Sequence, residues 1–268
     1  MSNDDGSLQL YLKLDEIKDG KVIDTSGNER NSTVHGNPQV VDDEFMGKCL
    51  QLEGKEDGID LHNKAIPVGA EITLSFWANG GDSLPNYSTV ICTKDSENNL
   101  LRTLTIYLPG IDYMVYFECG DNAENASNII FKQASPSDVK GQWSYWTFTK
   151  DANKGEMKIY LNGQLWHSEM GKTLPIPEVE IVQLGIFAEI PEGAEEEDKG
   201  SYQGKLAHFR IYSRALSQQE IKRDLALSIA PELEEELNEL RNIKKTKEGE
   251  QYDNWPEISK HFGLSTPE

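Results

Sequence analysis

Apolar and polar residues alternate in short runs from Leu8 to Tyr212, and clusters of glycine, asparagine, aspartate and proline separate these runs. A period of two residues is typical of strands that bury one face, and turn residues at such intervals are typical of an all-β sandwich or barrel. No helical period occurs in this part of the chain. The segment 143–148 is aromatic on both faces, which predicts a strand in the middle of a sheet.

The strongest local signal is the dipeptide Asn162-Gly163, which lies between the apolar runs 157–161 and 164–166. Asn-Gly supplies the two positive φ angles of a type I′ turn, and the twist of that turn matches the twist of the flanking strands. The sequence therefore predicts a two-residue β-hairpin here. A tryptophan just past such a turn, Trp166, is a candidate contact residue, because hairpin tips often expose their side chains.

The pattern changes after Arg214, where helical signals begin. Ser217 and Glu220 form a capping box, which predicts a short helix over about 218–229, and Pro231 suits the first turn of a second helix. The apolar stripe of that second helix is Leu233, Leu237, Leu240 and Ile243, and Trp255 lies in the apolar tail behind it. We therefore expect a β domain over residues 1–216 and a C-terminal helical extension over 217–268 that docks on its own domain or on a partner.

Charge and hydropathy narrow the possible partners and locations. The 268 residues include 46 Asp and Glu against 26 Lys and Arg, a formal net charge of −20 at pH 7, which disfavours binding to nucleic acid or to anionic membranes. No run of about 18 apolar residues occurs, so we expect no membrane-spanning helix. The N-terminus is polar and acidic, unlike a signal peptide, and we expect a cytoplasmic protein.

Several motifs follow one another in an order that is typical of a known family. They are Asp-Thr-Ser-Gly-Asn at 24–28, the small-residue strand at 47–54, Ile-Thr-Leu-Ser-Phe-Trp at 72–77, Trp-Ser-Tyr-Trp-Thr at 143–147, Tyr-x-Asn-Gly at 160–163, Tyr-Gln-Gly-Lys-Leu at 202–206 and Arg-Ile-Tyr-Ser-Arg-Ala-Leu-Ser at 210–217. Over about residues 8–225 this order resembles the laminin-G-like, pentraxin-like branch of the concanavalin A-like lectin/glucanase superfamily. The resemblance implies a two-sheet antiparallel jelly-roll sandwich, with one concave sheet that presents carbohydrate or protein ligands.

The alternation itself assigns two faces to the predicted strands. The expected core positions are Leu74, Phe76, Trp146, Phe148, Leu184, Ile186, Phe209 and Ile211, with Trp77 and Trp143 at buried family positions. The opposite face carries a polar and aromatic set that suits a sugar, because sugars present hydroxyls around apolar C–H surfaces. Its candidate ligand-binding residues are Tyr145, Tyr160, Gln183, Glu189, His208 and Arg210, and Thr73 and Ser75 lie beside them. The alternative is that this face is solvated or covered by a helix.

The resemblance also implies a structural Ca²⁺ site, to which Asp24 and Asn28 would contribute. The relatives usually have Gly-x-Ile-Asp-Glu near the last strand, whereas this chain has Gly-Lys-Leu-Ala-His at 204–208, so Ala207 stands where a carboxylate is expected. Loss of a charged ligand weakens a calcium site. The alternative is an Asx-turn in which Asp24 and Asn28 bond the local backbone.

No catalytic signature accompanies these motifs. Glycosidases of the superfamily carry paired carboxylates on one strand. The most similar pair in this chain is Glu178 and Glu180, which follows a Pro-Ile-Pro segment and is typical of the outer edge of a strand. We therefore expect a non-catalytic recognition module that binds glycan or protein through its concave face or loop rim. The alternative hypothesis is a structural or assembly component, in which the sandwich is a spacer and the C-terminal helices dock on a partner.

Overall fold

The computed structural model describes residues 6–54, 56–84, 87–94, 103–120, 128–186 and 200–230. Its strands form two sheets, and the paired strands run antiparallel. The first sheet contains β1 (Leu8–Leu12), β4 (Gln39–Asp43), β5 (Gly47–Glu53), β7 (Glu71–Gly80), β12 (Ser144–Asp151), β13 (Glu156–Leu161), β14 (Gln164–Met170) and β16 (Gln203–Tyr212). The second contains β2 (Lys21–Val22), β3 (Ser32–His35), β6 (Gly58–Asp60), β8 (Thr89–Lys94), β9 (Leu104–Tyr107), β10 (Met114–Cys119), β11 (Ile129–Gln133) and β15 (Ile181–Leu184).

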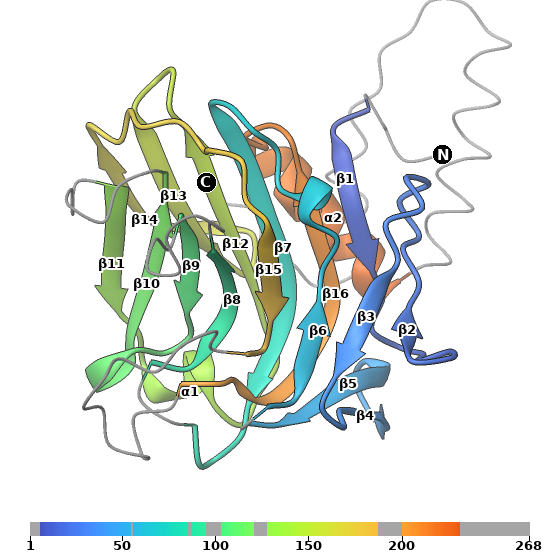
Figure 1. Ribbon diagram of the computed structural model, residues 1–268. Helices are drawn as coiled ribbons and strands as arrows, with labels where there is room; N and C mark the ends of the chain where they lie inside the picture. The colour runs from blue at the N-terminus through green and yellow to red at the C-terminus, as the bar shows by residue number, and fades with distance from the viewer. Residues whose placement is uncertain are drawn as a thin grey trace, which may run out of the picture. The chain divides into compact units, whose positions relative to one another are not determined.

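The first sheet has the order β14-β13-β12-β7-β16-β5-β4, with β1 also paired to β16, and the second has the order β11-β10-β9-β8-β15-β6-β3-β2 (Figure 1). This arrangement confirms the predicted all-β jelly-roll sandwich. The aromatic segment predicted to be central is β12, which pairs with β7 on one side and β13 on the other. Asn162 and Gly163 join β13 to β14 with φ angles of 49° and 74°, as the predicted hairpin requires.

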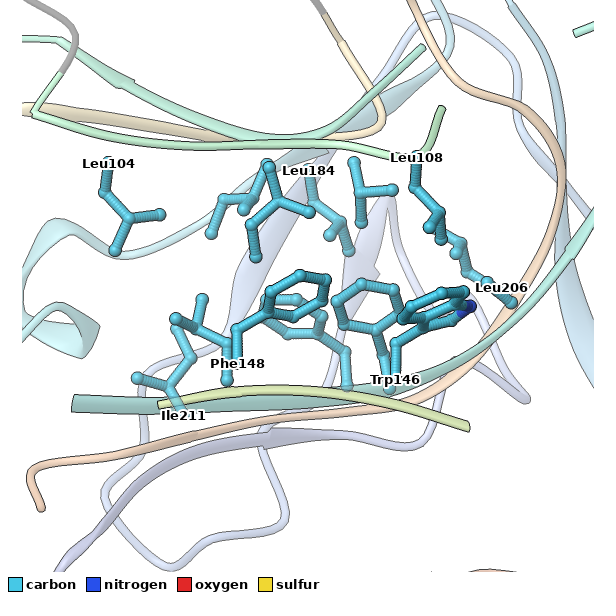
Figure 2. Packing of buried hydrophobic residues seen from close by; sticks show 14 of the residues in the cluster. Leu104, Leu108, Trp146, Phe148, Leu184, Leu206 and Ile211 are labelled. Atoms are coloured by element: carbon cyan, nitrogen blue, oxygen red, sulfur yellow. The ribbon is translucent and has the colours of Figure 1, made fainter. Parts of the chain in front are cut away.

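The core lies between the two sheets, and the alternation identified it correctly. Seven of the eight predicted core residues are fully buried and Ile186 is 7% exposed. Figure 2 shows the side chains of Trp146, Phe148 and Ile211 facing those of Leu104, Leu108 and Leu184 from the opposite sheet. Burial of such side chains from both layers is the main source of stability in a sandwich.

Three short helices connect or flank the strands: η1 (Asn63–Ala65), η2 (Ile111–Tyr113) and α1 (Pro136–Val139). The longer helix α2 spans Gln218–Ile229, as the capping box predicts. The Ser217 amide donates to Glu220 Oε2 at 2.8 Å. Arg214 bonds both oxygens of Glu220, and this contact lowers the pKa of Glu220 to about 2. The N-terminus of α2 is therefore fixed by a charged network as well as by the cap.

Residues 3–229 form one compact unit, which includes α2. The helix thus groups with the sandwich, although it lies within the C-terminal extension expected over 217–268. The predicted second helix with Leu233, Leu237, Leu240 and Ile243, and the tail with Trp255, lie outside the described residues. Within the described part of the chain, no helix is both long and apolar enough to cross a membrane.

Candidate functional site

Helix α2 covers the outer face of the first sheet, on the side away from the second sheet (Figure 1). Ile221 and Leu225 of the helix pack with Trp77, Tyr145 and Tyr160 in a second apolar cluster. The Trp77 indole N–H donates to Ser228 Oγ at 2.6 Å, which fixes the C-terminal half of the helix to β7. The part of this face that lies beneath α2 is therefore an interior layer.

Three predicted ligand-binding residues lie in that layer. Tyr145 is fully buried, Tyr160 is 4% exposed and Arg210 is 5% exposed. The expectation that they line a solvent-facing surface is wrong, and the helix-covered alternative holds for them. Trp77 is buried as expected, whereas Trp143 is half-buried and donates its indole N–H to Asp43 Oδ1 at 3.0 Å.

His208 lies at a β-bulge in β16, where the register shifts between Ala207 and Arg210 and the φ of His208 is 52°. Its Nδ1 lies 2.8 Å from the Tyr11 hydroxyl. Burial, together with the positive charges of Arg210 and Lys13, lowers the pKa of His208 to about 3. The half-buried imidazole is therefore neutral near pH 7 and is already engaged by Tyr11.

Trp166 also differs from the expectation of an exposed hairpin tip. The hairpin register pairs Leu165 with Tyr160 on the outer face, so the next residue, Trp166, turns toward the space between the sheets. A bulge follows, because Ile159 pairs with His167 and leaves Trp166 as the extra residue. Its ring meets that of Trp146 edge-on at 5.4 Å, and Lys132 Nζ lies 4.6 Å above it. Trp166 thus closes one side of the core.

Gln183 lies on β15 in the second sheet, so it does not share a face with Tyr145 and Arg210. The sequence pattern placed these residues together because it assigned faces within strands without assigning strands to sheets. Glu189 lies outside the described residues. Gln183 instead points to the outer face of the second sheet, where it joins two rows of side chains that sequence reasoning did not bring together.

The first of these rows is aromatic. Tyr107 pairs with Tyr116 and Tyr116 with Phe131 across β9, β10 and β11, with ring centroids 6.0 Å and 5.4 Å apart. Tyr87 extends the row, its ring 5.6 Å from that of Tyr107. Phe131 is 49% exposed, Tyr87 is 36% exposed and Tyr116 is half-buried, whereas Tyr107 is buried. We call these four residues the aromatic row.

The second row is mostly polar and crosses the same face two residues further along the strands. Its members pair in succession and are Asp60, Gln183, Cys92, Thr105 and Glu118, which we call the polar row. The Gln183 amide donates to Asp60 Oδ1 at 2.9 Å, and His35 Nδ1 lies 3.6 Å from Asp60 Oδ2. Cys92 and Thr105 are buried at the centre, whereas Asp60, Gln183 and Glu118 reach solvent.

The geometry of this face suits binding better than hydrolysis. Its described carboxylates, Asp60 and Glu118, are four strands apart in the register, about 19 Å at the usual strand spacing. Paired glycosidase carboxylates lie only about 5–9.5 Å apart. Rings beside hydrogen-bonding side chains, however, match the mixed surface of a sugar. The alternation in 105–107 and 116–118 already carried this signal, but it did not show which face stays open.

The turn predicted to bind calcium is occupied by hydrogen bonds. Asp24 Oδ1 accepts from the amides of Tyr11 and Ser26 at 3.0 and 2.8 Å, and Oδ2 accepts from the Ser26 hydroxyl and the Arg30 amide. Asn28 donates its side-chain N–H groups to the carbonyls of Leu8 and Gln9. Because hydrogens already point at both Asp24 oxygens and Asn28 presents its nitrogen, the residues of this turn do not fit a cation.

We predict that Asp24→Ala lowers the free energy of unfolding by about 2 kcal/mol, because four donors lose their acceptor. Urea unfolding of the variant and the wild type measures this loss. A chelator is expected to leave the wild-type melting temperature unchanged. The turn would be shown to bind calcium if EDTA lowered the melting temperature of the wild type and calcium restored it, while the Asp24→Ala variant showed no such change.

Comparisons with known proteins agree with this architecture. Domain 4 of AbnA, a GH43 extracellular arabinanase from Geobacillus stearothermophilus, in complex with arabinotriose, is 18% identical with a TM-score of 0.59, over 82% of this chain and 98% of that domain. The receptor-binding domain of a botulinum neurotoxin C/D mosaic serotype is 21% identical with a TM-score of 0.61, over 82% of this chain and 51% of that one. The binding domain of Paraclostridial Mosquitocidal Protein 1 is 19% identical with a TM-score of 0.59, over 82% of this chain and 52% of that one.

The chain thus spans about half the length of these toxin binding domains. At such identities the likeness is one of fold. No curated protein sequence gives a significant match. The family model described as "Concanavalin A-like lectin/glucanases superfamily" matches residues 53–222, more than half of the chain. With its two stacked antiparallel sheets and this match, the chain belongs to the concanavalin A-like lectin/glucanases superfamily.

Proposed function

We propose that the protein is a non-catalytic recognition module that binds a glycan across the outer face of its second sheet. The observation that carries this proposal is the aromatic row, Tyr87, Tyr107, Tyr116 and Phe131, beside the polar row on one sheet face. The rings offer surfaces for the C–H faces of sugars, and Gln183, Asp60 and Glu118 offer hydrogen-bonding groups for the hydroxyls. On the first sheet, the rings of Tyr145 and Tyr160 and the guanidinium of Arg210 are buried and not accessible to a ligand.

Two further observations support a neutral glycan. The exposed ionised groups of the polar row are carboxylates, Asp60 and Glu118, and the chain carries a net charge of −20, so sialylated or sulfated sugars would be repelled. The structurally similar arabinanase domain holds arabinotriose, an uncharged oligosaccharide. We therefore expect neutral oligosaccharides to bind in preference to acidic ones.

The test is a glycan array that contains both neutral and acidic oligosaccharides, followed by calorimetry with the best neutral ligand. Tyr116→Ala and Phe131→Ala are each expected to weaken binding about 10- to 100-fold, about 1.4–2.7 kcal/mol, because each removes a stacking surface. Leu165→Ala is the matched control, since Leu165 is also 49% exposed but lies on the first sheet. Affinity that survives both aromatic substitutions, or an array without any bound glycan, would exclude this face as a sugar site.

The assembly hypothesis stays a prediction, because its residues 231–268 lie outside the described part of the chain. Deletion of 231–268 tests it separately. A changed oligomeric mass of the deleted chain would support an assembly role, and unchanged glycan affinity would show that the two roles are independent. The expected cytoplasmic location also stays a prediction.

A further inference from the structure

Four buried polar groups in the described part of the chain lie together beneath α2 without a well-formed hydrogen bond, although the Tyr145 hydroxyl and Ser75 lie close enough to interact. They are Ser75 Oγ, Thr147 Oγ1, the Tyr145 hydroxyl and Arg210 Nη1. Their residues are between 0% and 5% exposed. We call them the buried donor cluster. Because buried polar groups in proteins are nearly always hydrogen-bonded, a group of four without well-formed hydrogen bonds in one place indicates that another species supplies them.

The strand register brings these groups to one spot. Arg210 on β16 pairs with Ser75 on β7, and Ser75 pairs with Thr147 on β12. Directly opposed side chains in antiparallel neighbours have Cβ atoms only about 4.5–5.5 Å apart. Tyr145 precedes Thr147 by two residues and therefore lies on the same face. Helix α2 closes this face through Ile221, Leu225 and their apolar neighbours.

The cluster also carries the positive charge of Arg210, which Asp224 faces without forming a direct ion pair with it. The guanidinium of Arg210 lies 4.1 Å from the centroid of the Tyr11 ring. None of the ion pairs among the described residues includes Arg210. The nearby Asp224 uses Oδ2 to accept the Tyr212 hydroxyl, and burial raises the pKa of Asp224 although the charge of Arg210 acts to lower it. Asp224 therefore compensates the guanidinium only in part. A buried cation in such surroundings requires compensation by a negative charge.

All four groups of the buried donor cluster can donate a hydrogen bond. A single water accepts only two hydrogen bonds and carries no charge, whereas a halide accepts several and neutralises the guanidinium. We propose that a small inorganic anion of the chloride class is enclosed between α2 and the first sheet, held by Arg210, Ser75, Thr147 and Tyr145. The site is separate from the glycan face, and it makes the anion part of the contact between helix and sheet.

The full-length protein is unfolded in urea, refolded in chloride-free sodium gluconate and then titrated with sodium chloride at constant ionic strength. Thermal unfolding is expected to shift upward by about 3–6 °C for each tenfold rise in chloride above the dissociation constant. Crystals grown in bromide are expected to show an anomalous peak within hydrogen-bonding distance of Arg210 Nη1. Equal melting temperatures in both salts, or ordered water alone at the site, would overturn the proposal.

The variant Thr147→Val tests whether the chloride dependence of the melting temperature arises at this site, because it removes one hydrogen-bond donor at nearly constant volume. The variant is expected to lose most of the chloride dependence at a similar melting temperature in gluconate. Thr149→Val is the matched control, since Thr149 is also buried and lies two residues further along β12 on the same face. A chloride dependence that both variants retain in full would place the ion elsewhere and contradict the assignment.

Discussion

Substitution of Phe148 by alanine lowers the free energy of unfolding by about 3–5 kcal/mol, the expected cost of removing a large ring from a packed core. Phe148 is fully buried, and its ring lies 5.9 Å from that of Phe76 and 5.4 Å from that of Phe117. Phe148 therefore joins the first sheet to the second, and its removal leaves a cavity between them. Urea unfolding followed by circular dichroism measures the loss.

Phe131→Ala is the control for this prediction, because Phe131 lies on the outer face of the second sheet and is 49% exposed. Its removal is expected to cost less than about 1 kcal/mol, since a half-exposed ring leaves only a small cavity. Equal losses for the two variants would contradict the assignment of Phe148 to the interior and Phe131 to the surface.

Substitution of Ile221 by aspartate is the second large effect, and it separates α2 from the sheet. Ile221 is 1% exposed and packs in the cluster with Trp77 and Tyr145. A carboxylate there cannot remain charged without water, so we expect a loss of about 3 kcal/mol or detachment of the helix. Detachment would expose Trp77, which shifts the tryptophan emission to the red and increases its quenching by iodide.

The exposed neighbour Gln219 gives the control for charge and helix propensity. Gln219→Asp introduces the same side chain two positions earlier in the same helix, where solvent reaches it. It is expected to leave both stability and iodide quenching close to those of the wild type. If Ile221→Asp behaves like this control, α2 does not seal the outer face of the first sheet.

Much of this fold was predictable from local pattern. The hairpin at Asn162 and Gly163, the cap of α2 at Ser217 and Glu220, and the inward positions such as Phe76 and Phe148 all follow from rules that act over a few residues. Such rules are reliable because the conformation of a turn or a cap depends on its own side chains. The order of the family motifs then indicated how these pieces assemble.

The candidate site was less predictable, and particular residues show why. Bulges interrupt the alternation in β14 opposite Ile159 and in β16 before Arg210, so a parity counted across either of them assigns the wrong face. Lys150 has the inward parity of Phe148 and is fully buried, with its Nζ bonded to the Cys119 carbonyl and to Asn128 Oδ1. A polar residue at an inward position is not recognisable from the sequence, since its partners are distant in the chain.

Local pattern in the chain specified the strands, the turns, the start of α2 and, apart from the bulges, the inner and outer side of each strand. The tertiary structure alone decided which outer face remains accessible: α2 covers Tyr145, Tyr160 and Arg210, whereas Tyr116, Phe131 and Gln183 reach solvent on the second sheet. The physical reason is that side-chain alternation is a local property of a strand. Coverage of a face depends on where a segment from a remote part of the chain comes to pack.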